Sequence, residues 1–185
     1  MRLTALVLVL VATVLPAMAT PAAFPPTAPE VSEFKTLPAG VLLKATGRGS
    51  YFDESNRLFR PLFNYISSHD IAMTTPVEAK IDGAAMYFWV APSEEAKVVG
   101  NRGGVEVVKI GERRVASRGV AGAYSRSNFE EARDALLTWL AQQPGVVADG
   151  EPYAVYWHGP FTPWFAKRSA VHIPVRAVEP PRQPS

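Results

Sequence analysis

The chain contains no cysteine and only three histidines among its 185 residues. The absence of thiols excludes disulfides, thiolate metal sites, cysteine nucleophiles and thioether attachment of a cofactor. Packing alone must therefore hold the fold together. His69, His158 and His172 form neither an HxH nor an HExxH motif, so we expect no closed metal site built from protein ligands alone.

The motifs of several large enzyme classes are also missing. There is no GxSxG nucleophile elbow and no phosphate-binding loop, and Gly47-Arg48-Gly49 lacks the third glycine of a dinucleotide fingerprint. The formal net charge is only +2, which argues against a nucleic acid or a strongly acidic partner. These absences favour a binding protein over an enzyme.

Long apolar runs are absent except at the start of the chain. There, Arg2 precedes an apolar run over 6–15 and the small-residue site Ala17-Met18-Ala19, a pattern typical of a secretory signal peptide. The run is shorter than the roughly 20 residues that span a bilayer, although an uncleaved anchor is the alternative. We therefore expect residues 1–19 to be a signal peptide and the protein to be periplasmic or secreted, with no stable membrane insertion after cleavage.

The remaining chain divides by composition into three parts. Residues 20–30 are rich in proline, alanine and threonine, which predicts a flexible spacer. The proline-rich residues 179–185 are expected to form a disordered tail. One folded domain is expected over residues 31–178, a length sufficient to bury a core.

Each half of this domain contains an amphipathic helix among strands. The first helix is expected to begin near Asp53 and to be kinked or broken at Pro61, with an apolar face made of Leu58, Phe59, Leu62, Phe63 and Ile66. The second is expected to be capped by Ser127, with Glu130 completing a capping box, and to end at Gly145. The expected strands cover residues 41–48, 71–81, 85–91, 105–110, 113–121, 153–157 and 170–178.

The two halves resemble each other at an offset of 73 residues. Gly49-Ser50-Tyr51 leads into the first helix and Gly122-Ala123-Tyr124 into the second, and the same offset aligns Phe63 with Leu136 and Ile66 with Trp139. A duplicated strand-helix-strand-strand unit predicts an α+β fold. Its antiparallel sheet would curve into an open barrel, with the two helices packed outside.

Two segments stand out from this framework. Residues 71–77 read Ile-Ala-Met-Thr-Thr-Pro-Val and follow the first helix directly. Residues 156–168 form a proline-stiffened loop that carries four large rings within nine positions, at Trp157, Phe161, Trp164 and Phe165. So much apolar area must either cap the core or form a binding surface.

Both segments resemble motifs of the SOUL haem-binding protein family. The first is similar to the family's Met-Thr-x-Pro-Val element, and the second to its aromatic-Thr-Pro-aromatic-Phe element with a basic pair. Residues 63–66, Phe-Asn-Tyr-Ile, also fit, and the resemblance covers residues 31–178. It implies the duplicated α+β barrel shared with effector-binding domains. It also implies non-covalent binding of haem or another tetrapyrrole, without transferring an iron ligand.

With this resemblance, the ligand-binding residues are expected on the first helix and the aromatic loop. Basic side chains there could pair with propionates and large apolar ones could line an apolar cleft. The candidates are Arg57, Arg60, Phe63, Met73, Trp164, Phe165, Lys167 and Arg168. The alternatives are that Met73 fills the core, that the basic residues are simply exposed, and that the aromatic loop is a lid or plug. The metal ligand is unknown; His69 and His158 are weak candidates, as opposed to a residue at the helix end and a polar turn residue.

The sequence is compatible with two other functions. The first is a small-molecule-binding or hydrolytic domain of the effector-binding barrel superfamily that uses a buried carboxylate. Glu78, Glu151 and Tyr153 would be its acid–base candidates, and a carboxylate deep in a cleft with a raised pKa would favour it. The second is an envelope interaction module that binds no haem.

Overall fold

The computed structural model describes residues 22–159 and 161–178, so the predicted signal peptide and tail lie outside the described residues. Two α-helices and nine strands follow one another in this part of the chain. Two short 3-10 helices, η1 and η2, lie in connections. The elements are β1 (Ser32–Leu37), β2 (Gly40–Thr46), α1 (Tyr51–Ser68), β3 (Val77–Lys80), β4 (Ala85–Val90), η1 (Pro92–Lys97), β5 (Glu106–Ile110), β6 (Arg113–Ala121), α2 (Arg126–Leu140), β7 (Val146–Ala148), β8 (Tyr153–Tyr156), η2 (Trp164–Ala166) and β9 (Arg168–Ala177).

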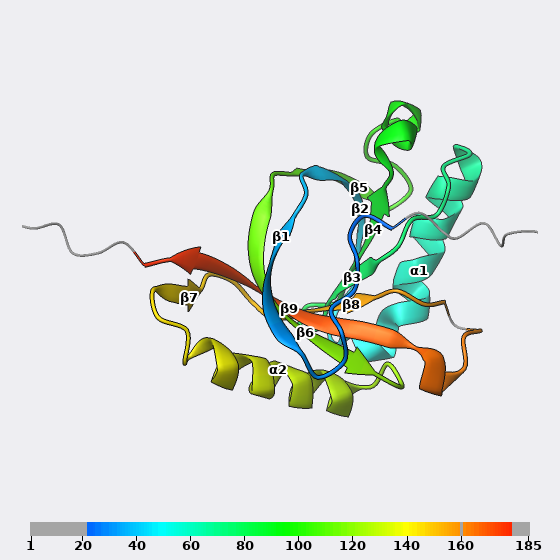
Figure 1. Cartoon of the computed structure of the whole chain (residues 1–185). Helices are drawn as coiled ribbons and strands as arrows, with labels where there is room; N and C mark the ends of the chain where they lie inside the picture. Colours follow the sequence, from blue (N-terminus) through cyan, green and yellow to red (C-terminus); the bar gives the residue numbers. More distant parts are fainter. Residues whose placement is uncertain (1–21, 160, 179–185) are drawn as a thin grey trace, which may run out of the picture.

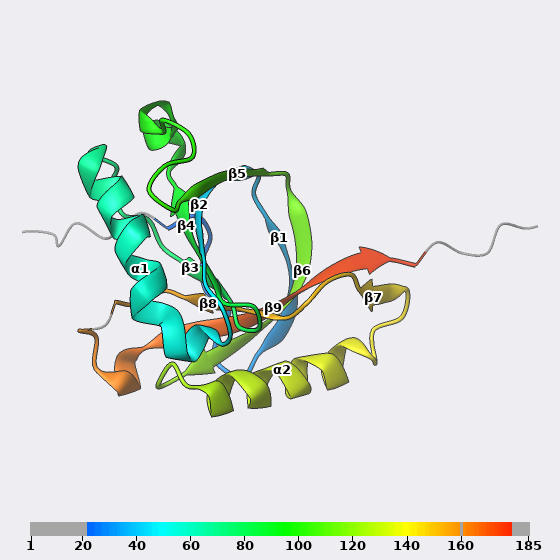
Figure 2. The same cartoon turned by 180° about the vertical axis from the view of Figure 1, so that it is seen from behind.

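The sheet has the internal symmetry that the repeat predicts. Its strand order is β1-β6-β9-β8-β3-β4-β2-β5, and the short β7 pairs with β9 beside this path. The order is symmetric about the β8–β3 pair, so β9 corresponds to β4, β6 to β2 and β1 to β5. The paired strands are antiparallel, and Figures 1 and 2 show the sheet curling with both helices on its outside. The predicted α+β open barrel is confirmed.

Alternation along the strands gives the sheet two apolar faces. On β2, Leu43 faces α1 in the outer core, whereas Leu42 belongs to a separate cluster on the inner face. The outer core also receives Leu62 of α1 and Leu136 of α2, both fully buried. Each such side chain contributes about 1.5–3 kcal/mol relative to an exposed one. The inner cluster is centred on Trp89 and the neighbouring strands.

The start of α1 differs from the sequence prediction. Ser50 is the N-cap, and its hydroxyl accepts a hydrogen bond from the Phe52 amide at 3.3 Å. Asp53 lies inside the first turn, where its negative charge is favourable beside the helix N-terminus. Pro61 lies inside the helix, which continues to Ser68, so of the predicted kink or break at Pro61 the break is wrong.

The second helix is capped two residues earlier than predicted. Ser125 is the N-cap and accepts a hydrogen bond from the Asn128 amide at 3.2 Å. Ser127 lies within α2, and Glu130 lies 3.7 Å from Arg126 on the next turn instead of completing a capping box. The helix ends at Leu140 rather than at Gly145, so these parts of the prediction are wrong.

The repeat is real but changes register at the helices. Gly49 and Gly122, 73 residues apart, both have positive φ angles, of 94° and 100°. Within the helices the buried positions match at an offset of 74: Leu58, Leu62 and Ile66 of α1 correspond to Ala132, Leu136 and Leu140 of α2. The alignment of Phe63 with Leu136 is therefore wrong, because Phe63 is exposed and Leu136 is buried.

Most strand predictions agree with the structure to within two residues at each end. The bounds of β6 are those expected, and β2, β4, β5, β8 and β9 differ from prediction by one or two residues at an end. The strand predicted over residues 71–81 is wrong in its first half, since β3 begins only at Val77. The strands β1 and β7 were not predicted.

Residues 22–30 do not form the flexible spacer predicted from their composition. They run in extended form along the inner face of the sheet into β1, and we call them the strap (Figure 1, dark blue). Phe24 of the strap is only 6% exposed and belongs to the inner apolar cluster. Thr27 is also buried and lies 2.7 Å from the Ser117 hydroxyl. The strap is therefore part of the folded domain.

Candidate functional site

A cluster of buried and half-buried polar side chains lies on the inner face, with one residue from each of five strands. Glu78 Oε1 accepts hydrogen bonds from Trp89 Nε1 at 3.0 Å and from Arg113 Nη2 at 2.5 Å. Arg113 Nη2 also lies 3.4 Å from the Tyr153 hydroxyl, which in turn lies 3.4 Å from His172 Nδ1. The cluster thus connects a carboxylate to an imidazole through a guanidinium and a phenol.

Burial shifts the proton affinities of this cluster. It raises the pKa of Glu78 above the ordinary carboxyl value, although the nearby Arg113 guanidinium opposes the shift. Burial lowers the pKa of His172 to about 3, and the positive charges of Lys35 and Arg113 act in the same direction. Burial also raises the pKa of Tyr153. His172 is therefore a neutral imidazole at neutral pH, and Tyr153 keeps its proton.

The acid–base trio of the enzymatic alternative is only partly assembled. Glu78 and Tyr153 lie in the buried cluster, but Glu151 is exposed in the loop before β8. Glu78 meets the criterion of burial with a raised pKa. Its Oε1 is nevertheless engaged by an ion pair that joins β3 to β6, and structural ion pairs also perturb pKa values. The geometry indicates a structural role for this pair.

A surface hollow lies along the second half of α1, and we call it the α1 hollow. Its volume is about 390 Å³, and it lies between the helix and the loop before β5. Two of the predicted site residues, Arg60 and His69, line it together. Its full lining is Arg60, Pro61, Asn64, Tyr65, Ser68, His69, Arg102 and Gly103. Arg102 was not predicted, because its glycine-rich loop carries no local signal that places it beside α1.

The environment of His69 determines which ring nitrogen is available. His69 Nδ1 lies 2.7 Å from the Tyr65 carbonyl oxygen, and the two rings are 4.6 Å apart. Because a carbonyl oxygen only accepts hydrogen bonds, Nδ1 carries the proton of the neutral imidazole and Nε2 carries the lone pair. Nε2 is the nitrogen that a metal ion could use. This backbone contact also orients the ring, as outer hydrogen bonds do for metal-bound histidines.

The other residues predicted on or near the first helix do not line the α1 hollow. Arg57 is exposed and lies 3.5 Å from Glu54 in an ion pair, outside the lining of the hollow. Phe63 is exposed and stacks on Phe59, with ring centroids 5.6 Å apart. Met73 is partly buried against the outer core, which matches the alternative in which it fills the core.

The aromatic loop between β8 and β9 does not cap the core. Phe161, Trp164 and Phe165 are 99%, 68% and 65% exposed, whereas Trp157 at its start is buried in the inner cluster. None of these residues, and neither Lys167 nor Arg168, lines the α1 hollow. Of the predicted ligand-binding residues, only Arg60 therefore lines the hollow, and the others are spread over the exposed surface of α1, the outer core and the aromatic loop.

The base of the aromatic loop is held by its predicted polar residues. Lys167 Nζ lies over the Tyr124 ring at 4.9 Å from the centroid, and Arg168 Nη1 donates to the Lys167 carbonyl at 2.9 Å. His158 Nδ1 accepts a hydrogen bond from the Arg168 amide at 3.0 Å. His158 thus closes the loop, as expected of a polar turn residue.

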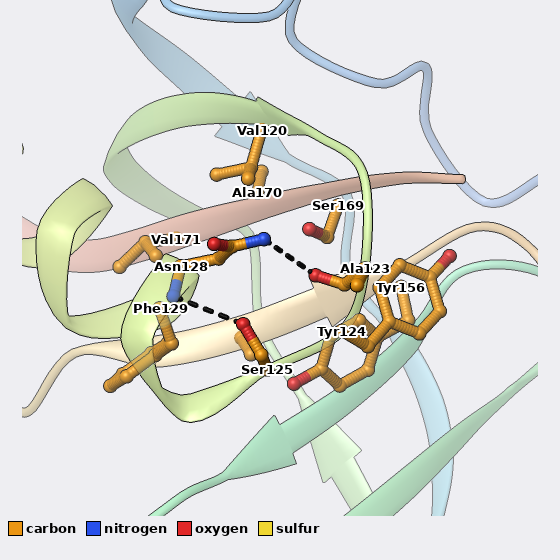
Figure 3. A pocket seen from close by; sticks show the side chains of 11 residues that line it. Val120, Ala123, Tyr124, Ser125, Asn128, Phe129, Tyr156, Ser169, Ala170 and Val171 are labelled. Atoms are coloured by element: carbon orange, nitrogen blue, oxygen red, sulfur yellow. Dashed lines mark hydrogen bonds between the residues drawn. The ribbon is translucent and has the colours of Figure 1, made fainter. Parts of the chain in front are cut away.

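A second, enclosed pocket lies where α2 begins (Figure 3). Tyr124 and Tyr156 lie at one side of it, and Asn128 donates to the Ala123 carbonyl at 2.8 Å within it. Its volume is only about 10 Å³, roughly the space of one water molecule. This pocket cannot hold a macrocycle.

Within residues 22–159 and 161–178, no group of three or more His, Cys, Asp or Glu side chains is placed to hold a metal ion. In the same ranges, neither helix is long and apolar enough to cross a bilayer.

Solved structures with the same fold come from several proteins of low sequence identity. The C-terminal domain of EcmrR aligns at 15% identity with a TM-score of 0.63, over 80% of this chain and 98% of that domain. In a complex of EcmrR with DNA, the match spans only 58% of that chain. A hydrolase from Listeria innocua aligns at 12% identity with a TM-score of 0.54, over 80% of this chain and 94% of that one. These likenesses show the fold alone.

A third protein with this fold is SAV2435 bound to tetraphenylphosphonium, at 11% identity and a TM-score of 0.51, over 79% of this chain and 94% of that one. No curated protein matches the chain. The sequence model described as SOUL heme-binding protein matches residues 11–174, which include both motifs and every described strand except the end of β9. The chain belongs to the SOUL heme-binding protein family.

Proposed function

We propose that this protein binds haem or a related tetrapyrrole non-covalently in the α1 hollow. The observation that carries the proposal is the pair of guanidinium groups in that hollow. Arg60 and Arg102 both line it, and neither has a carboxylate partner among the described residues. Two anionic propionates suit two such groups, because guanidinium–carboxylate pairs are strong and directional.

The remaining lining also fits a tetrapyrrole. The volume of about 390 Å³ lies within the range of small-molecule sites. Pro61 and Tyr65 offer apolar surface, and His69 Nε2 carries the lone pair that an iron ligand needs. Bound haem would supply an iron centre with open coordination positions, while Arg60 and Arg102 hold the acidic edge of the macrocycle.

The proposed site revises the set expected from the sequence. Arg60 keeps its role, and Arg102 replaces Arg57 as the second cation. Of the two weak ligand candidates, only His69 lines the hollow, so it is kept and His158 is dropped. Membership in a family of binding proteins supports a non-enzymatic function. We also propose that the protein is exported, on the basis of the signal pattern over residues 1–19.

A visible absorption titration of the purified mature protein with haemin tests the binding. A saturable Soret shift with an end point at one equivalent is the expected result. A shift that rises without saturation would mean that haemin adsorbs nonspecifically. That result would favour the envelope interaction module without haem.

Charge reversal then tests the location. Because each charge-assisted contact is worth about 1.5–3 kcal/mol, Arg60→Glu with Arg102→Glu should weaken haemin binding at least about tenfold. Arg133→Glu on α2 is the control, since Arg133 bonds Asp134 at 2.8 Å away from the hollow. Equal haemin affinity in the double variant and the wild type would exclude the α1 hollow.

Metal-free protoporphyrin IX isolates the role of His69. If Nε2 ligates iron, His69→Ala should weaken haemin binding and shift the Soret maximum, while the affinity for protoporphyrin IX stays within about twofold. Equal losses for both ligands would show that His69 only packs against the macrocycle.

A further inference from the structure

The strap is held on the inner face mainly by isolated contacts. Its ends form single parallel bridges, Ala22 with Thr75 and Pro29 with Gly119. Between them, the Phe24 carbonyl accepts a hydrogen bond from Trp157 Nε1 at 3.3 Å, and other strap groups meet side chains of the sheet. Three of its residues are prolines, which cannot donate to a β-ladder. The strap therefore resembles a bound peptide more than a strand of the sheet.

The ring of Phe24 occupies a slot made of aromatic side chains. It meets Trp89 and Trp157 edge to face, with ring centroids 5.6 and 6.0 Å apart. A third ring, His172, lies 5.8 Å away at a tilt of 33°. The slot thus accepts one phenyl group, surrounded by the indole rings of two strands.

Two hydrogen-bond donors around this slot have no acceptor. Among the described residues, His172 Nε2 and Arg113 Nε are buried and make no hydrogen bond. Arg113 Nη2 donates toward the Tyr153 hydroxyl, whose own proton then points to His172 Nδ1. With the Tyr153 proton directed to Nδ1, the proton of the neutral imidazole lies on Nε2, and both unsatisfied atoms are then donors. Buried donors without acceptors cost free energy that an incoming oxygen atom would recover.

We propose that the inner face holds a second ligand site, which takes a small uncharged aromatic compound with an acceptor oxygen, such as an aryl ketone. The strap occupies this site in the absence of the ligand. The phenyl group of the ligand replaces the ring of Phe24, and its oxygen accepts the hydrogen bond of His172 Nε2. Charges on the inner face are balanced by the pairs Glu78–Arg113 and Glu33–Lys35, which is why an uncharged ligand fits best.

The fold provides a way to release the strap without changing the slot. A Cβ atom at Gly119 would lie 2.2 Å from the Ala28 carbonyl oxygen and 2.4 Å from that of Thr27. Any side chain at position 119 therefore expels the end of the strap, while Trp89, Trp157 and His172 are untouched. Valine is well suited to this position because it favours strands.

The test compares acetophenone with ethylbenzene, which has the same ring and nearly the same size but no oxygen. Binding to the full mature protein is followed by the fluorescence of its tryptophans and by calorimetry. In Gly119→Val, acetophenone should bind about tenfold more tightly than ethylbenzene, the value of one buried hydrogen bond. It should also bind at least about tenfold more tightly than in the wild type, where the strap competes.

Two further variants make the outcome specific. His172→Leu in the Gly119→Val background should abolish the preference for acetophenone, and Arg60→Glu should leave it unchanged, which separates this site from the α1 hollow. If Gly119→Val fails to fold by circular dichroism, Thr27→Val replaces it, because it removes the contacts of the Thr27 hydroxyl with Ser117 and Glu33.

Hydrogen exchange of the strap's backbone amides measures its release directly. The Ala23 amide donates to the Thr75 carbonyl at 2.7 Å, so its exchange in the wild type should accelerate when acetophenone binds. Equal affinities for acetophenone and ethylbenzene would overturn the assignment of a polar ligand. Equal affinities of the wild type and the strap variant for acetophenone would overturn the competition by the strap.

Discussion

Replacing Phe24 by alanine should cost about 3 kcal/mol of unfolding free energy. Burying a phenylalanine side chain contributes about 1.5–3 kcal/mol. Each favourable aromatic pair adds about 0.5–1.5 kcal/mol, and Phe24 meets both Trp89 and Trp157 edge to face. In a closed core the resulting cavity would add a further penalty. Because the strap can detach instead, the loss is limited to the free energy with which the strap docks.

This limit predicts a specific failure of additivity. Gly119→Val expels the end of the strap through its clash with the Ala28 carbonyl, so it should also remove the docking free energy. Once the strap is detached, the Phe24 ring no longer contacts the sheet, so replacing it by alanine has no further effect. The double variant should therefore lose about 3 kcal/mol of unfolding free energy rather than about 6. The expected coupling is therefore as large as either single effect.

Urea denaturation followed by tryptophan fluorescence measures all four proteins of this cycle. The control cycle combines Phe24→Ala with Leu136→Ala. Leu136 belongs to α2 and lies in the outer core, so the two losses of unfolding free energy should add within about 0.5 kcal/mol. If Phe24→Ala and Gly119→Val were also additive within that margin, the strap would not dock as one unit. The reasoning about competition at the inner face would then be wrong.

Four other expectations can be checked independently. The pKa of His172 is about 3 in the fold and near 6.5 in the unfolded chain, so between these values the unfolded state binds more protons and the free energy of unfolding should fall as the pH drops. The raised pKa of Glu78 has the opposite effect, because it lowers the free energy of unfolding as the pH rises. In urea titrations at several pH values, His172→Gln should flatten the fall at low pH. In chemical denaturation, Leu136→Ala should lower the free energy of unfolding by about 2–5 kcal/mol, because Leu136 is fully buried. Trp139→Ala should lower it by less than the roughly 3–5 kcal/mol of a fully buried tryptophan, since Trp139 is only partly buried beside Phe34. Intact mass of protein recovered from the envelope should give Thr20 as the first residue, and a species that retains residues 1–19 would show an anchor instead. Haemin affinity should be the same within about twofold in Gly119→Val and the wild type, because α1 and the strap lie on opposite faces of the sheet, and a tenfold change in a titration would contradict this separation.

The sequence predicts the fold well where local periodicity decides it. The apolar spacing of Leu58, Leu62 and Ile66 reflects a face that the structure buries, and the continuous pattern of β6 gives its bounds correctly. The cap of α2 is mispredicted because Ser127 with Glu130 three residues later matches the local pattern of a capping box. The structure instead caps the helix at Ser125, whose hydroxyl accepts a hydrogen bond from the Asn128 amide. Two serines two residues apart both satisfy the N-cap preference, and the local sequence does not choose between them.

The sites are predicted less completely for a related reason. Arg60 and His69 could be proposed individually, but Arg102 reaches the same hollow from a glycine-rich loop far along the chain. The composition of the strap predicts a flexible spacer, because its many prolines and alanines outweigh a single aromatic residue in the average. A single aromatic residue, Phe24, reverses that outcome, since Trp89 and Trp157 offer it a slot that exists only in the folded sheet.

The alternation of side chains along each strand allows one sheet to serve two ligands. On β4, Phe88 faces α1 in the outer core while its neighbour Trp89 faces the strap. The α1 hollow lies between the helix and the loop before β5, and none of the residues that hold the strap lines it. Family membership supports tetrapyrrole binding by the chain as a whole, and the α1 hollow and the inner face are two separate proposals for where ligands bind. On that face, the unsatisfied donors of His172 and Arg113 are a free-energy cost that the strap does not relieve, which is the physical reason to expect another occupant.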